Sequence, residues 1–354
     1  YVKTDGAASN ANAGVAAPLL PSGGDDRLVG ACSMHILGGE IDHLRAYAPS
    51  QARAGEPVSV LVRPEDAYDN VACRCLGELE VRHDGRVLPV SAAPVPGSTC
   101  VRLSMTAPGT PGVIRLECRD VATGLTATTN PVRCLEAIGE SNVYWGMIHG
   151  HTELSDGTMS IEHYFRQMKD EVALDFAAPG DHDHRYETPE VLWETTCEAV
   201  QRRHDPGRFV TFLGYEWAKW RRNGDGDRNV YYLHDNRPLY RSDDGDYPSP
   251  PDLFRVLEEN GETGMVIPHH PGHHGNFCDW QDHSPKYERL VEIFQVRGSY
   301  ECSEAEGNPL PERHGKAQPY EDGFVRRALA LGWRVGFTAG GDDHAGLWGT
   351  ESVI

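Results

Sequence analysis

Histidine and carboxylate side chains are concentrated in a few short stretches of the second half of this 354-residue chain. Imidazole and carboxylate ligands together suit zinc, manganese or iron, and ligands from several strands could hold two or three such ions. We therefore predict a metal site with two or three divalent ions (Zn, Mn or Fe). Nine of the 17 histidines fall into four clusters, and these are His149, His151, His182, His184, His269, His270, His273, His274 and His344.

The first cluster, "HGHTELSDG", directly follows an apolar run. The alternation of side chains at a strand end sends His149 and His151 to the same side, so both can reach one ion. Asp156 can fold back toward them from the next turn. It could equally be a turn residue in front of a helix that starts at Ile161 and is capped by Ser160.

Two further stretches add ligands after apolar strands. In "APGDHDHR" either His182 or His184 could bind metal while the other orients a ligand or contacts the substrate, and we favour His182. In "FVTFLGYEW", Glu216 stands among aromatic residues, and a bridging position between two ions would compensate its burial. A salt bridge to Arg221 or Arg222 is the alternative.

The remaining metal candidates lie near the end of the chain. In "VIPHHPGHHG" the following proline restricts His270 to extended backbone, which favours it over His269 as the ligand. Glu292 sits in the apolar run "LVEIFQV", where it is a metal ligand or supports one, with an ordinary buried ion pair as the alternative. In "GFTAGGDDHAG", Asp342 and His344 repeat the spacing of the first cluster.

Other residues could act on a substrate. An unligated imidazole titrates in the range useful for protonating a leaving group, and with Glu216 the catalytic candidates are His184, His273 and His274. The run "KWRRNGDGDR" could receive a phosphate, sulfate or carboxylate, although a solvated loop explains it equally well. The substrate-binding candidates in this run are Lys219, Arg221, Arg222 and Arg228.

The elements that must position these residues change along the chain. Residues 1–36 lack apolar periodicity and are expected to form an extended arm. Residues 37–138 contain short β-prone runs between Gly, Pro and Asp turns, which predict an antiparallel β-sandwich of immunoglobulin-like type. In residues 139–354, apolar strands alternate with helical stretches and polar clusters follow the strands, which predicts an α/β domain with its site at the strand ends. This domain lacks a final helix, so we expect its C-terminal part to be incomplete.

Composition narrows the function classes. The net charge of −20 disfavours binding to nucleic acid, and there is no apolar stretch long enough to span a membrane. No signal peptide is visible, so a cytoplasmic location is expected unless a leader has been removed. The nine cysteines include no C-x-x-C pair and are interpreted as small buried residues, with one or two disulfides as the alternative.

The order of these motifs resembles the polymerase-and-histidinol-phosphatase (PHP) superfamily of metal-dependent phosphoesterases. Its H-x-H with a following acidic residue, D-H, H-P and D-x-H motifs match, in this sequence, His149/His151/Asp156, Asp181/His182, His270/Pro271 and Asp342/His344. Within it, "YWGMIHGHTELSDG", "LGYEW", "GDRNVYYLHD" and "IPHHP" look like DUF3604-type proteins, which also carry a β-domain in front of the barrel.

The resemblance implies a distorted (β/α)7 barrel with three ions. It implies that one ion lies among His149, His151, Glu216 and Asp342. A second would lie among Glu216, His270 and the region of Glu292, and a third among Asp156, His182 and His344.

Three functions follow as hypotheses. The first is hydrolysis of a small-molecule phosphate ester by a metal-activated water. The second keeps the metal site but cleaves a non-phosphate bond of a carbohydrate or metabolite. The third is a non-enzymatic binding protein in which the metals only stabilise the fold.

Overall fold

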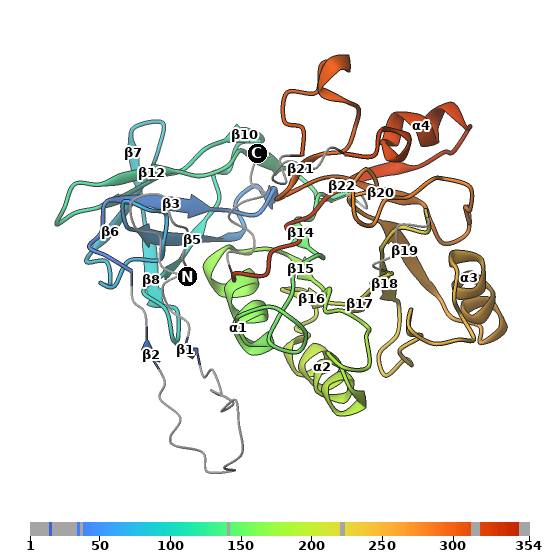
Figure 1. The fold of residues 1–354 in the computed structure, drawn as a ribbon. Helices are drawn as coiled ribbons and strands as arrows, with labels where there is room; N and C mark the ends of the chain where they lie inside the picture. Colours follow the sequence, from blue (N-terminus) through green and yellow to red (C-terminus); the bar gives the residue numbers. More distant parts are fainter. Residues whose placement is uncertain are drawn as a thin grey trace, which may run out of the picture. The chain divides into compact units, whose positions relative to one another are not determined.

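The computed structural model describes residues 14–15, 34–35, 38–139, 142–219, 224–312 and 319–346. The chain divides into two compact units. The first consists of Tyr1–Trp145 and Arg166–Asp175, and the second of Gly146–Phe165 and Phe176–Ile354 (Figure 1). Of the predicted arm, the described residues include only the paired strands β1 (Gly14–Val15) and β2 (Met34–His35).

Besides the β1–β2 pair, the first unit contains three small sheets and is β-rich, as expected. Two are antiparallel throughout and the third contains one parallel pair. In order across each sheet, the strands are β3 (His43–Tyr47), β5 (Pro57–Glu65), β9 (Val101–Thr106) and β8 (Val90–Pro94); β12 (Thr126–Thr128), β11 (Glu117–Asp120), β6 (Leu79–His83) and β7 (Arg86–Leu88); and β10 (Gly112–Ile114), β13 (Val132–Leu135) and β4 (Gln51–Arg53).

Alternating side chains of these three sheets meet in one hydrophobic core. In β9, for example, the odd-numbered residues Val101, Leu103 and Met105 are buried, and they join Val81 of β6 and Val132 of β13. Each fully buried side chain of this size contributes about 1.5 to 3 kcal/mol relative to an exposed one. The first unit therefore has a core of its own.

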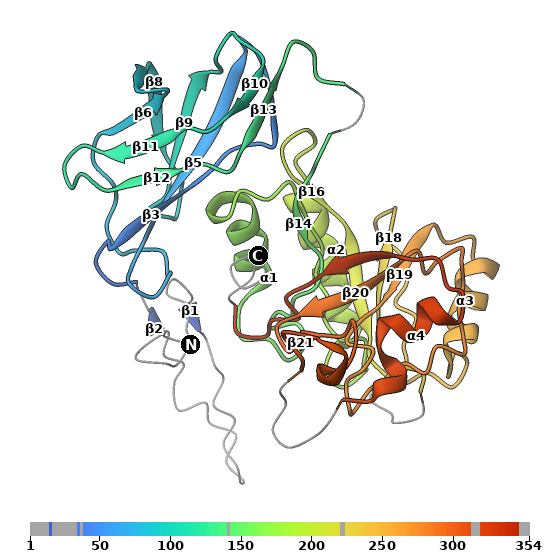
Figure 2. The ribbon, with the colours of Figure 1, turned by 90° about the horizontal axis from the view of Figure 1, so that it is seen from above.

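The second unit contains three three-stranded sheets and most of the helices (Figure 2). The sheets are β14 (Gly146–Met147), β15 (Phe176–Ala177) and β16 (Val210–Thr211); β17 (Leu213–Trp217), β18 (Arg228–Tyr232) and β19 (Gly264–Pro268); and β21 (Gly298–Ser299), β20 (Leu290–Gln295) and β22 (Gly336–Ala339). Its helices are α1 (Ile161–Arg166), α2 (Glu190–Arg203), α3 (Pro250–Glu259), η2 (Glu304–Glu306), η3 (Glu321–Gly323) and α4 (Val325–Ala330), whereas η1 (Gln167–Glu171) belongs to the first unit.

The prediction of a (β/α)7 barrel for this unit is wrong. Only the β14–β15–β16 sheet is purely parallel, whereas β18 pairs antiparallel with both β17 and β19. A barrel would need a helix between each pair of consecutive strands. Among the residues described in this region, α3 lies between β18 and β19, but no helix lies between β17 and β18. The strand–helix alternation breaks because the Gly- and Asp-rich segment before β18 forms a loop and the "RNVYY" segment forms an unforeseen strand.

The two longer helices have the apolar stripe expected of surface helices. In α2, Trp193, Cys197 and Val200 recur at helical spacing and are buried. In α3, a proline occupies the first helical position after Ser249, where its missing N–H has no intrahelical partner to lose. These helices are held by burial of one face against the unit rather than by their own length.

Cysteines and apolar helices give two further findings. The eight described cysteines are free, and six of them are buried, whereas Cys73 and Cys75 are exposed. The ninth, Cys32, lies outside the described residues. No helix within the described ranges is long and apolar enough to cross a membrane.

Candidate metal centre

Four extended segments lie side by side and carry most of the candidate ligands. Asp342 donates its N–H to the carbonyl of His149 at 3.0 Å, and His151 donates to the carbonyl of Asp343 at 2.9 Å. On the other side, Gly180 donates to Gly150, and the segment of His182 pairs in parallel with Glu216 at the end of β17. Neighbouring strand ends thus present their side chains to one place.

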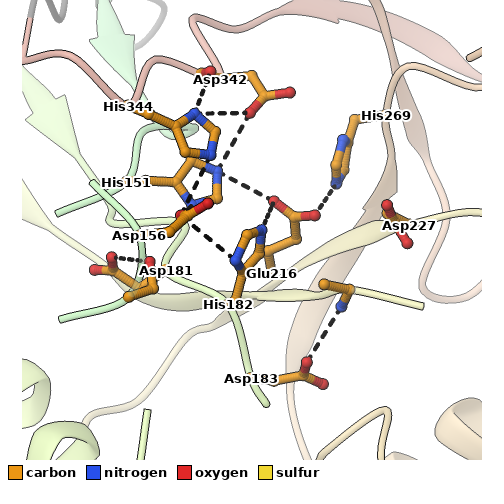
Figure 3. A network of polar contacts seen from close by, with 12 residues as sticks. His151, Asp156, Asp181, His182, Asp183, Glu216, Asp227, His269, Asp342 and His344 are labelled. Atoms are coloured by element: carbon orange, nitrogen blue, oxygen red, sulfur yellow. Dashed lines mark hydrogen bonds and ion pairs between the residues drawn. The ribbon is translucent and has the colours of Figure 1, made fainter. Parts of the chain in front are cut away.

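Glu216 stands at the centre of this cluster (Figure 3). Its Oε2 lies 3.2 Å from His151 Nε2 and 3.5 Å from His149 Nε2. Asp342 Oδ1 lies 3.3 Å and 3.7 Å from the same two nitrogens. These four groups can converge on one ion.

A second group forms around Asp156. Its Oδ1 lies 3.5 Å from Nδ1 of both His151 and His182, and 3.3 Å from His344 Nε2 (Figure 3). The rings of His151 and His344 are stacked with centroids 3.9 Å apart. The side chain of Ser160 accepts the N–H of His163 at 3.1 Å and so caps the helix that follows. Asp156 is therefore not the capping residue.

A third group uses the other oxygen of Glu216. His269 Nε2 lies 3.5 Å from Glu216 Oε1, and His270 can complete a set with these two residues. Because Oε2 faces His149 and His151 while Oε1 faces His269, Glu216 is placed to bridge two ions. The structure therefore brings both His269 and His270 to the cluster and does not choose between them.

The hydrogen bonding of these histidines tests whether metal ions fit. Nε2 of His149, both ring nitrogens of His151 and both of His269 are buried without a hydrogen-bond partner. All three imidazoles are completely buried. Leaving a buried polar atom unpaired costs about 1 to 3 kcal/mol. Three of the five nitrogens, Nε2 of each ring, lie within 3.5 Å of the buried Glu216 carboxylate, so they fit cation ligands well.

Burial and neighbouring charges shift the pKa values of the carboxylates in this cluster in opposite directions. Burial raises the pKa of Glu216, but the neighbouring imidazoles, with that of His269 foremost, pull it well below the ordinary glutamate range. For Asp342 burial also acts to raise the pKa, and His149 and Arg297 lower it well below the usual value. Burial depresses the pKa of His269. The carboxylates are therefore ionised, and the imidazole of His269 is neutral, as metal binding requires.

We expect the stability of the metal-free protein to fall in mild alkali because of His182. Burial lowers the pKa of His182, but Glu216 and the other nearby carboxylates raise it to about 10. A folded-state pKa above the unfolded value of about 6.5 gives stability that is complete below about pH 6.5 and lost as the pH rises toward 10. Urea unfolding of chelator-treated protein between pH 6.5 and 10 should show this fall.

The control for that experiment is His182→Asn, which should flatten the dependence on pH. Added divalent metal should stabilise the unaltered protein most at the alkaline end, because the ion then displaces fewer protons. A pH profile unchanged by the substitution would contradict the assignment.

Glu292 was predicted as a metal candidate and lies behind His149. Its Oε2 is 2.9 Å from His149 Nδ1, on the side of the ring opposite Nε2. Glu292 can form a group with His149 and His269, but its hydrogen bond to His149 Nδ1 orients a candidate ligand. An added Cβ at Gly340 would come within 2.0 Å of the Glu292 carboxylate, so only glycine leaves room for it.

Asp181 positions the turn that carries Asp156. Its carboxylate accepts the N–H of Thr152 at 2.7 Å, the Thr152 hydroxyl at 2.8 Å and the Ser155 hydroxyl at 2.6 Å. All these bonds lie in the turn before Asp156. The two residues of the D-H motif therefore have different roles: Asp181 supports the turn, and His182 is the candidate ligand.

Backbone geometry corrects one expectation. His270 has φ of +30°, so the following proline does not hold it in extended backbone. A turn closed by the bond from His273 N–H to the His270 carbonyl at 2.8 Å prevails over that local preference. Asp342 also has a left-handed φ of +48°. Such conformations in non-glycine residues are costly and concentrate at functional sites.

The three candidate catalytic histidines lie around the cluster in different settings. His184 Nε2 donates to the Ala218 carbonyl at 2.7 Å, and its Nδ1 lies 3.2 Å from Glu187. His273 Nδ1 is 2.5 Å from the buried carboxylate of Glu312, and its ring centroid is 5.2 Å from that of His270. The ring of His274 lies 4.5 Å from that of His273.

The predicted substrate-binding cations are engaged within the protein. Arg228 is buried and its Nε lies 2.8 Å from Glu288 Oε1. Lys219 is also buried, with Nζ bonded to the Pro248 carbonyl and 5.1 Å from the centre of the Trp217 ring. Arg221 and Arg222 lie outside the described residues. Arg228 and Lys219 thus stabilise the fold around their own partners.

Residues that the sequence patterns did not single out complete the surroundings. Glu187 lies 3.2 Å from Nδ1 of His182 and of His184. Gln295 donates to Asp342 Oδ2 at 2.6 Å, and Arg297 contacts the same oxygen. The only signal for Gln295 and Arg297 was their position shortly after Glu292, Gln295 at the end of the same strand and Arg297 two residues beyond it, and polar residues in such positions are common.

Comparison with known families finds one match. Residues 156–309 match the family described as "Protein of unknown function (DUF3604)". The matched range contains Glu216, His269 and Glu292 but ends before Asp342. This agrees with the DUF3604-type resemblance, and the match does not extend to the PHP superfamily.

Similar proteins come from chlamydiae. The chain is 26% identical over 321 residues to a protein of Chlamydia pneumoniae and 27% identical over 322 residues to one of Chlamydia trachomatis, both described as uncharacterized. Each alignment covers 89% of this chain and 51% of the relative, so the chain spans about half the length of these relatives.

Solved structures resemble only parts of the chain. The Lin-41 filamin domain is 18% identical with a TM-score of 0.20, and covers 25% of this chain and 85% of its own. The Yersinia pseudotuberculosis adhesin InvE is 17% identical with a TM-score of 0.20, and covers 27% of each chain. These partial likenesses assign neither a fold nor a function.

Proposed function

We propose that the second unit is a metal-dependent hydrolase that cleaves a phosphate ester of a small molecule with two or three bound divalent ions. The observation that carries this proposal is the set of five buried imidazole nitrogens without hydrogen-bond partners, three of which lie within 3.5 Å of the buried carboxylate of Glu216. Buried charges of this kind are paired or coordinate metals. A purely structural polar network would instead satisfy its donors and acceptors internally.

The order of the motifs supports the reaction class. His149/His151, His182, His270 and the pair of Asp342 with His344 follow the pattern of PHP phosphoesterases. Membership of that superfamily is part of the proposal, and it concerns the ligand set and not the barrel architecture.

The chain's residues divide into ligands and supports. The ligands are His149, His151, Asp156, His182, Glu216, His269 or His270, Asp342 and His344. Bound ions would supply a nucleophilic water at neutral pH and polarise the bond to be broken. Glu216 would hold two ions at a fixed separation through its two oxygens.

An anionic substrate is favoured by the position of Arg297. Its guanidinium contacts Asp342 at the edge of the cluster, and its side chain is 29% exposed. A permanent planar cation suits a phosphate oxygen, because the guanidinium can donate two parallel hydrogen bonds. Arg297 thus takes the role first predicted for Lys219 and Arg228.

His273 is the best placed of the predicted proton donors. The buried carboxylate of Glu312 lies 2.5 Å from its Nδ1 and fixes the orientation of the ring. We expect His273→Asn to lower kcat about 100-fold for an alkyl phosphate, whose leaving oxygen needs a proton. The same variant should retain most of its activity on 4-nitrophenyl phosphate, whose leaving group does not. Equal losses on both substrates would contradict the role.

Phosphate release is the direct test of the proposed reaction. Protein stripped with a chelator and reloaded with Mn²⁺ or Zn²⁺ should hydrolyse some member of a panel of sugar, nucleoside and aryl phosphate esters, releasing inorganic phosphate from a monoester or the alcohol from a diester. Arg297→Met should raise KM for that substrate when it is assayed at saturating metal, a condition needed because Arg297 also contacts the candidate ligand Asp342. Inactivity of the metal-loaded protein across the panel would count against phosphate, and cleavage of acetyl or glycosyl esters in its place would favour the non-phosphate alternative.

A further inference from the structure

We propose that strand β20 is an orienting strand, which holds His149 and Asp342 in their metal-binding orientation through Glu292 and Gln295. The inference rests on the proposed metal cluster and assigns a positioning role to two residues that face it from one strand. It also assigns a purpose to the irregularity in that strand.

Glu292 fixes the ring of His149. Glu292 Oε2 lies 2.9 Å from His149 Nδ1, and both side chains are almost completely buried. A carboxylate accepts a hydrogen bond, so Nδ1 carries the proton and Nε2 keeps the lone pair for a metal. Nε2 faces Glu216 at 3.5 Å and Asp342 at 3.7 Å, which is the centre of the cluster.

Gln295 fixes the carboxylate of Asp342. Its amide donates to Oδ2 at 2.6 Å, and the glutamine is completely buried. The amide oxygen accepts from the Arg297 guanidinium at 3.0 Å and from the Arg297 N–H at 3.2 Å, which sets the orientation of the amide. Oδ2 of Asp342 is thereby occupied, and Oδ1 is left facing His151 Nε2 at 3.3 Å.

A bulge in β20 lets both residues reach the cluster. Residues three apart in a regular strand point to opposite faces, so Glu292 and Gln295 would normally diverge. In β20 the register against β22 shifts from Glu292 opposite Thr338 to Phe294 opposite Ala339, which leaves Ile293 as the extra residue. A bulge of this kind redirects the side chains that follow it.

Binding of Co²⁺ tests this role, because both its affinity and its visible absorption depend on the arrangement of the ligands. The variants Glu292→Met and Gln295→Met keep the approximate volume and remove the hydrogen bond. Each should weaken Co²⁺ binding about 10- to 100-fold, the usual effect of losing an outer-shell partner, and should change the absorption spectrum. Glu292→Gln retains an acceptor for Nδ1 and should bind Co²⁺ within a few-fold of the unaltered protein.

Two controls make the result specific. Gln51→Leu removes another buried glutamine, in the first unit, and should leave Co²⁺ binding unchanged. Deletion of Ile293 should reproduce the spectrum of Gln295→Met, since the residues after the bulge would then turn away. Circular dichroism verifies that each variant is folded, and Glu292→Gln provides the comparison if deletion of Ile293 prevents folding.

Several outcomes would overturn the inference. Folded Met variants with unaltered Co²⁺ affinity and spectrum would show that β20 orients nothing. If Glu292→Gln lost as much Co²⁺ affinity as Glu292→Met, Glu292 would be a ligand instead of an orienting group. If the unaltered protein takes up no Co²⁺, the proposed metal centre fails, and the positioning role fails with it.

Discussion

Replacing Glu216 by Gln should abolish binding of at least one metal ion and lower phosphate release by at least about 10³-fold, the upper range for losing one electrostatic stabiliser. Glu216 Oε2 faces His151 and His149 while Oε1 faces His269, so the amide removes a charge shared by the whole cluster. The metal-free variant should also lose about 3 to 5 kcal/mol of unfolding free energy, because buried imidazoles lose their counter-charge. Elemental analysis and urea unfolding measure the two effects.

Glu288→Gln is the matched control. Glu288 is another completely buried carboxylate. Its Oε1 lies 2.8 Å from Arg228 Nε, and it is not one of the candidate ligands. Its loss should destabilise the protein to a similar extent and leave the metal content unchanged. If both variants keep their metal, or both lose it equally, Glu216 is not a ligand.

The second large effect is expected for His151→Gln. His151 contributes to two groups, with Nε2 near Glu216 and Asp342 and Nδ1 near Asp156. Its removal should weaken binding of two ions, each by more than the roughly 10- to 100-fold typical of an outer-shell loss. Calorimetric titration with Zn²⁺ or Mn²⁺ should therefore show fewer binding events.

His283→Gln serves as the comparison for His151→Gln. His283 lies 3.2 Å from the buried carboxylate of Glu288, but no candidate ligand is among its partners in the described contacts. The titration curve of this variant should match that of the unaltered protein. A curve for His151→Gln that also matches it would remove His151 from the site.

Local patterns predicted the strands and their polar ends, but not how the strands pair. "GMVIPHH" and "RVGFTAGGDDH" each contain a strand followed by polar residues, and "LVEIFQV" contains a strand that ends in Gln295. The antiparallel pairing of β18 with β17 and β19 depends on contacts between segments far apart in the sequence, such as Val230 with Val266. Alternation of strands and helices cannot foresee such a pairing, and the barrel prediction failed for this reason.

Ligand candidates were easier to predict than their supports. His149 with His151 and Asp342 with His344 share a spacing of two, and the structure places both pairs on neighbouring segments. The orienting position of Glu292 depends on a bulge that no local residue type announces.

The cations near Glu216 show the same limit. Arg228 was predicted to bind substrate because it follows Glu216 closely in the sequence. Its actual partner, Glu288, lies 60 residues away and could not be identified from the sequence. Arg297, by contrast, reaches Asp342 across 45 residues. Burial and long-range pairing, which decide these roles, are properties of the folded chain.

The central claim is that the imidazole and carboxylate groups around Glu216 hold divalent ions. An anomalous difference map, recorded at the absorption edge of the metal with crystals of Zn²⁺- or Mn²⁺-loaded protein, tests it most directly. We predict two or three peaks within coordination distance of Glu216, His151 and Asp156. A map without a peak at Glu216 or His151, from protein that was saturated with metal, would contradict it.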